Sequence, residues 1–202
     1  MPTYKEKLIS IFEQMRMLNE SHHRELEKIA VNAALSQEGK DARTAEQQAK
    51  DARTAERLNG EALAIIDEAR AAIEKRWHDA SAGRLTDEGY QSGISNAIRM
   101  AELGVIDKVS LPDIVEAYKD DLTTLNAIRA IIEKSYPEHV KKDLLPLIPA
   151  DTRQATLDNF EQMRKDINKI IGAKALESNN LITRIALTNR YIIQVLNDDL
   201  SL

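Results

Sequence analysis

The residues best suited to chemistry in this 202-residue chain are two adjacent histidines, His22 and His23, with glutamates on either side. Glu20, His23 and Glu27 follow i, i+3, i+7 spacing, so Glu20-x-x-His23 matches the half-site of di-iron four-helix bundles. Such a centre needs a second Glu-x-x-His motif and two more glutamates, which only a homodimer could supply here. The favoured interpretation is a histidine pair that is solvated or faces a helix seam.

The rest of the chain does not complete a reactive centre. Glu74 lies four residues before His78, and Glu138 is adjacent to His139, so neither pair has ligand spacing. There is no cysteine, nucleophile elbow, phosphate-binding loop, dinucleotide fingerprint or His-Glu-x-x-His motif. We therefore predict a protein that is not an enzyme and has no catalytic, cofactor-binding, metal-binding or nucleic-acid-binding residues. An enzyme whose site gathers carboxylates or histidines from distant helices is the minor alternative.

Charge is spread evenly along the chain, whose net charge is −5. Residues 1–85 carry 14 Lys and Arg against 15 Asp and Glu, and residues 86–202 carry 14 against 18, so neither half has the basic face that nucleic-acid binding needs. The acid pairs Asp120-Asp121 and Asp198-Asp199 diverge by about 100° on a helix, which favours solvated faces.

Hydropathy predicts neither a membrane protein nor a secreted one. No segment approaches the roughly 18 consecutive apolar residues that span a bilayer, and the first ten residues lack the apolar core of a signal peptide. The polar faces of the amphipathic stretches mix Asp and Glu with Arg, whereas membrane-surface helices are usually basic there. We expect a protein that is cytosolic or assembled in the cytosol.

Residues 1–85 are expected to form long amphipathic helices, as a coiled-coil arm or a hairpin with a break near Gly39. Thr3 and Glu6 form a capping-box pattern. A charge at Ile11 or Ile65 is expected to cost on the order of 3–5 kcal/mol of stability. The expected seam contains a stutter after Leu18 and comprises Tyr4, Leu8, Ile11, Met15, Leu18, His22, Leu26, Ile29 and Ala33.

One repeat is present, because KDARTAE at residues 40–46 returns at residues 50–56. Ten residues fall about 80° short of three helical turns, so the two copies cannot present the same face to one partner. Trp77 is favoured as a core residue over an exposed anchor for a partner. The expected seam consists of Ala42, Ala45, Ala49 and Ala52, followed by Leu58, Ala62, Ile65, Ala69, Ile73 and Trp77.

Residues 86–202 are expected to form a separate five-helix bundle, which makes the fold all-α. Gly83 and Thr86 are the predicted caps at the boundary, and Gly104 ends the first helix. Ser110, with Asp113, is expected to open one continuous helix over residues 111–135. The five expected helices cover about 87–103, 111–135, 138–145, 151–175 and 178–198. The apolar last helix must be buried, either within the chain or between subunits.

Residues 105–134 (VIDKVSLPDIVEAYKDDLTTLNAIRAIIEK) and the Cys-free, acidic, helical composition resemble small virion proteins from the head modules of tailed bacteriophages of Gram-positive hosts. The resemblance implies a structural, capsid-associated decoration protein or minor head protein. Its partners would be the major capsid protein or another virion protein, together with copies of itself. It would be located in the virion, after assembly in the host cytoplasm. A scaffolding role is less favoured because the chain lacks a basic helical end.

The alternative is a helical export chaperone or adaptor that binds a partner protein. The long first helix and the asparagine-containing last helix favour this interpretation, and the last helix resembles the substrate-gripping helix of flagellar secretion chaperones.

Overall fold

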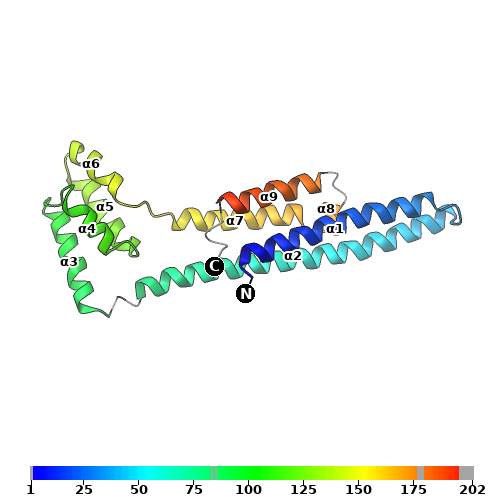
Figure 1. Ribbon diagram of the computed structural model, residues 1–202, viewed down its shortest axis with the longest axis horizontal. Helices are drawn as coiled ribbons and strands as arrows, with labels where there is room; N and C mark the ends of the chain where they lie inside the picture. Colours follow the sequence, from blue (N-terminus) through cyan, green and yellow to red (C-terminus); the bar gives the residue numbers. More distant parts are fainter. Residues whose placement is uncertain (1, 83, 85, 177–179, 196–202) are drawn as a thin grey trace. The chain divides into compact units, whose positions relative to one another are not determined.

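The computed structural model describes residues 2–82, 84, 86–176 and 180–195, and these form helices joined by turns and short irregular segments, with no strand (Figure 1). The all-α prediction is therefore confirmed for this part of the chain. By their contacts the residues group into two compact units, unit 1 from Met1–Ile73 with Ala155–Leu202 and unit 2 from Glu74–Gln154. The helices are α1 (Tyr4–Val31), α2 (Gln37–Ala82), α3 (Glu88–Glu102), α4 (Ser110–Ala117), α5 (Leu122–Ser135), α6 (Glu138–Leu144), the 3-10 helix η1 (Leu145–Leu147), α7 (Arg153–Ile170), α8 (Ala173–Leu176) and α9 (Leu181–Val195).

This grouping differs from the expected division into 1–85 and 86–202. The segment after residue 155 packs in unit 1, because α7 carries partners for α2 along its length. Arg164 pairs with Asp67, and Arg70 pairs with Glu161. The last helix, α9, contacts α1. Burial of the apolar last helix within the chain is thus observed at Leu181 and Ile185.

The first two helices form a hairpin, which answers the question that the sequence left open between a hairpin and a rod. α1 and the α2 residues of unit 1 run side by side in opposite directions (Figure 1). Thr3 caps α1 with the expected capping box. The break lies at residues 32–36, because Asn32 caps the end of α1 and the Ser36 hydroxyl accepts the Gly39 N–H. Gly39 therefore lies within the first turn of α2, and the interruption between the two helices comes before it.

The buried row of α1 differs from the expected seam. Leu18 is half-buried, whereas Asn19, one residue further on, is buried. With Asn19 in the row, no stutter is needed, because the steps through His22 keep 4-3 spacing. The buried residues of α1 are Leu8, Ile11, Phe12, Met15, Asn19 and His22. His22 thus faces inward, as predicted.

The buried residues of α2 follow one another in steps of 4, 3 and 4, so the pattern repeats every 11 residues. This corresponds to about 3.67 residues per turn, which is close to the period of a straight α-helix. Ile66 is in this row, whereas the predicted Ile65 and Trp77 are half-buried. The expected alanine seam is wrong at Ala42, Ala45 and Ala49, which are exposed. Their small side chains bury too little area to define a contact face. The buried α2 residues are Asp51, Ala55, Leu58, Ala62, Ile66, Ala69 and Ile73.

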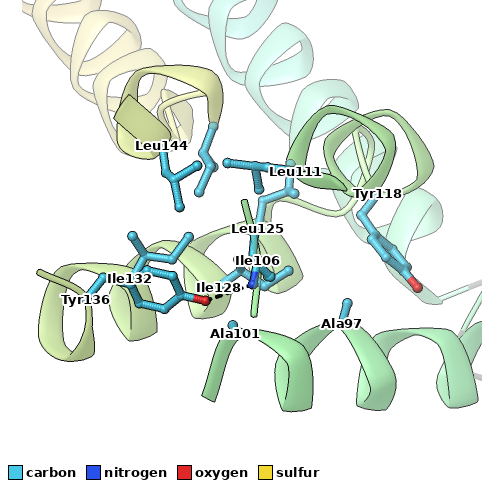
Figure 2. Packing of buried hydrophobic residues seen from close by; sticks show 11 residues of the cluster. Ala97, Ala101, Ile106, Leu111, Tyr118, Leu125, Ile128, Ile132, Tyr136 and Leu144 are labelled. Atoms are coloured by element: carbon cyan, nitrogen blue, oxygen red, sulfur yellow. Dashed lines mark hydrogen bonds between the residues drawn. The ribbon is translucent and has the colours of Figure 1, made fainter. Parts of the chain in front are cut away.

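Unit 2 is built around one apolar cluster to which α3, α4, α5, α6 and the following turns contribute (Figure 2). α3 begins with Asp87 as its cap, not Thr86, and ends at Glu102, two residues before the predicted Gly104, which has φ +70°. The predicted cap at Gly83 lies outside the described residues. The buried members of the cluster are Ala97, Ala101, Ile106, Leu111, Tyr118, Leu125, Ile128, Ile132, Tyr136, Leu144 and Ile148.

The expected continuous helix over 111–135 is wrong, because it breaks between α4 and α5. Asp121 starts α5 as its cap, accepting the Thr124 N–H at 3.1 Å and the Thr124 hydroxyl at 2.7 Å. The Tyr90 hydroxyl donates to the same carboxylate at 3.0 Å. Ser110 lies inside α4, which is preceded by a turn around Asp107. Two short helices replace one because an aspartate cap and its partners stabilise the break.

Candidate functional site

Two regions of the described chain have features beyond ordinary packing. One is a buried polar cluster in unit 1, which includes one of the paired histidines. The other is an apolar surface on unit 2, formed by the turn between α3 and α4 and by α6.

The polar cluster is centred on His22 of α1 and Asp51 of α2. His22 Nδ1 lies 2.8 Å from Asp51 Oδ2, and the two side chains are only 4% and 7% exposed. The Gln47 side chain donates to the same carboxylate oxygen at 2.9 Å. Asn19 donates to the Leu176 carbonyl at 3.2 Å, which ties α1 to α8. Buried polar groups are costly unless they are paired, and this cluster pairs them across three helices.

The KDARTAE repeat explains why only one aspartate joins this cluster. Asp41 of the first copy is exposed and accepts a hydrogen bond from Gln37, four residues earlier. Asp51 occupies the same place in the second copy and has the same kind of bond from Gln47, but it is buried against His22. The predicted difference in face between the two copies is confirmed, because a ten-residue step rotates the second copy by about 80°.

The di-iron half-site is not assembled. Glu20 is paired with Arg16 at 2.6 Å, and His23 is exposed, with its Nε2 3.3 Å from the Asn19 side-chain nitrogen. Glu27 is exposed. Among the described residues, no three His, Asp or Glu side chains gather in the way that metal ligands do.

The other sequence candidates have separate surroundings. Asp120 pairs with Arg84 at 3.1 Å, whereas its neighbour Asp121 is a half-buried cap of α5. The two acids therefore do not meet, but they lie in the turn before α5 and not on the solvated helix face that was expected. His78 and His139 are both exposed. The Asp198-Asp199 pair lies outside the described residues.

The surface of unit 2 is an apolar groove between the α3–α4 turn and α6, which we call the 104–144 groove. It has a volume of about 610 Å³, and its apolar lining includes Ile106, Tyr136, Val140 and Leu144. Lys108 pairs with Asp143 at 3.0 Å, which links the turn to α6. Val109 also lines the groove, and Leu103 and Val105 are exposed on the same turn.

The turn that presents these side chains is firmly bonded. Asp107 Oδ1 accepts from the Val109 N–H at 3.0 Å, the Ser110 N–H at 2.8 Å and the Ser110 hydroxyl at 2.8 Å. The hydrogen bonds from the Ser110 N–H and hydroxyl are the main cause of the lowered pKa of Asp107. The Tyr136 hydroxyl accepts the Ile106 N–H at 3.3 Å, shown as a dashed line in Figure 2. The exposure of Val109, at 81%, is therefore fixed by local structure.

This surface was not predicted from the sequence. The residues that point to it are the run Leu103-Gly104-Val105-Ile106 and Val109, because this run is unusually apolar for a segment between two helices. Turns are ordinarily polar, and exposed apolar side chains that cluster mark interaction sites.

Comparison of the chain with protein-family models, curated proteins and solved structures gives no match. Within the described residues, no helix combines the length and the apolar character required to cross a bilayer.

Proposed function

We propose that this protein is a non-enzymatic structural component that acts by packing its helical surfaces against a partner protein. The observation that carries the proposal is the apolar surface around the 104–144 groove, where Leu103, Val105 and Val109 are exposed on a turn fixed by hydrogen bonds. Burying such side chains at an interface contributes favourable free energy without rearrangement of the unit.

The proposed setting is a bacteriophage particle, where the chain acts as a capsid-associated decoration protein or minor head protein. Support comes from the resemblance over residues 105–134, which include most of the turn that borders the groove. The proposed partner is the major capsid protein or another virion protein that offers an apolar segment. The groove has both signs of charge on its wall, from Asp107, Lys108 and Asp143, so charge alone does not select the partner.

The test is an affinity pull-down of the tagged full chain from producing cells, with partners identified by mass spectrometry. Val109→Asp places a charge on the apolar surface, and we expect it to lower recovery of the partner by about tenfold or more. Val31→Asp is the matched control, because Val31 is 74% exposed on α1 in unit 1, compared with 81% for Val109.

Near-stoichiometric recovery of a virion protein that Val109→Asp reduces and Val31→Asp preserves would support the proposal. Recovery of one secretion substrate alone would favour the export chaperone. Recovery of no partner, or equal effects of the two variants, would contradict the role of this surface.

A further inference from the structure

The buried polar cluster of unit 1 opens onto a pocket that the proposed structural function does not use. The pocket has a volume of about 270 Å³ and is walled by His22 of α1, by Gln48, Ala49 and Ala52 of α2, and by the α8 segment. We call it the His22 pocket. Its size suits only a ligand smaller than a typical drug-sized molecule.

Of the two ring nitrogens of His22, Nδ1 is hydrogen-bonded to a protein group and Nε2 is not. Nδ1 is 2.8 Å from the Asp51 carboxylate, so Asp51 fixes the proton on that nitrogen. Within the described residues, Nε2 makes no hydrogen bond, although the side chain is only 4% exposed and its ring lines the pocket. Nε2 is not one of the described side-chain atoms that are fully buried without a partner, so it is reachable from the pocket and can bond a ligand there.

The described residues that line the pocket include a cationic side chain and no anionic one. Lys174 of α8 is the one cationic residue besides His22 among these described residues, and no carboxylate is among them. Gln48 adds a side-chain amide, which can donate, and the remaining wall is formed by alanines and Leu176. A ring that donates from both nitrogens carries a positive charge, which Asp51 balances from behind.

We propose that the His22 pocket binds the oxyanion of a small molecule, a phosphate or a carboxylate group. The oxyanion enters together with one proton, which His22 Nε2 takes up, so that Nε2 and Lys174 both donate to the oxyanion. The apolar wall contacts the rest of the ligand. Because the pocket is built from α1, α2 and α8, the bound ligand links α8 to the hairpin and stabilises unit 1. The inference is independent of the groove on unit 2.

The experiment is an NMR titration of the 15N-labelled full chain, in which long-range proton–nitrogen correlations report on the histidine rings. Inorganic phosphate and butyrate are the two probes, each added against chloride at constant ionic strength. We expect a saturable shift of the His22 ring signals with at least one probe. His139, which is exposed in unit 2, is the internal reference and should not show it.

Lys174→Met is the decisive variant, because Lys174 is exposed and its loss should leave the fold intact. We expect it to weaken binding by about tenfold or more, since it removes one of two charged donors. Lys165→Met, at another exposed lysine of unit 1, should leave the affinity within about twofold.

A response to phosphate alone would assign phosphorylated ligands, and a response to butyrate alone would assign carboxylates. His22 signals that move no more than those of His139 with both probes would overturn the proposal. Equal effects of Lys174→Met and Lys165→Met would also overturn it, because the anion would then be held by general surface charge.

Discussion

Replacing His22 alone should cost more stability than replacing both members of the His22–Asp51 pair. His22→Leu removes the donor 2.8 Å from Asp51 and leaves a carboxylate that is 7% exposed, with Gln47 as the remaining side-chain donor in the described structure. A buried charge that loses its partner typically costs several kcal/mol, so we expect about 3 kcal/mol for this variant.

Asp51→Leu has a smaller expected cost. In this variant the ring N–H of His22 loses its acceptor, which gives about 1.5 kcal/mol. In the double variant His22→Leu/Asp51→Leu, both polar groups are gone and two apolar side chains face one another. We expect its free energy of unfolding to lie within about 1.5 kcal/mol of that of the original chain, so the two substitutions are coupled by at least about 3 kcal/mol.

Urea unfolding followed by circular dichroism at neutral pH measures all three variants. Asp41→Leu is the control, because Asp41 occupies the same place in the first repeat copy but is exposed. We expect it to change the free energy of unfolding by less than about 0.5 kcal/mol. Additive single losses in the double variant, near 4.5 kcal/mol in total, would refute the buried-pair reasoning.

Three further predictions concern packing, helix propensity and pH. Ile66→Asp should cost about 4 kcal/mol and Ile65→Asp about 1 kcal/mol, because only Ile66 is fully buried, and equal thermal-melt shifts would contradict this. Gly60→Ala should stabilise the chain by about 0.5–1 kcal/mol, since Gly60 is inside α2 with open space around its Cα; a lower urea midpoint would contradict it. Arg153 lowers the pKa of Asp151 from 3.8 to about 2, so this carboxylate stabilises the fold above pH 4 and its contribution is lost as pH falls toward 2. In Arg153→Met, a carboxyl NMR titration should show the Asp151 pKa rising toward 3.8, and an unchanged value would contradict the assignment.

Hydrophobic periodicity was sufficient to predict an all-helical chain but not every helix boundary, since the expected helices over 111–135 and 151–175 are each broken in two. The phase of the repeat was sufficient to predict that its two copies face differently. Hydrophobic periodicity misplaced the α1 row at residue 18, because a polar side chain, Asn19, occupies a core position that the pattern assigns to Leu18. The same periodicity predicted one continuous helix past Tyr118, because the apolar spacing continues into α5. The helix breaks there because Asp121 caps the start of α5. Local patterns cannot rank a cap against a continuing stripe, since a cap is worth about 1 kcal/mol and a few i, i+4 pairs of about 0.2–0.5 kcal/mol each add up to a similar amount.

The two candidate sites were less accessible from the sequence. His22 was predicted to face inward, but its partner Asp51 is 29 residues away, and only the hairpin brings the two together. The 104–144 groove depends on how α6 packs beside the α3–α4 turn, which no local pattern encodes. The exposure of Val109 follows from the bonds of Asp107 to the turn, and these also appear only in the folded structure.

The most direct test of the proposed structural role is site-specific photocrosslinking in cells that produce the protein. A photoreactive residue replaces Val109 in one variant and Val31 in the other, and the crosslinked proteins are identified by mass spectrometry. The proposal predicts one dominant crosslinked species at position 109, a capsid or other virion protein, and no such species at position 31. Absence of any crosslinked protein at position 109, or the same proteins at both positions, would contradict it.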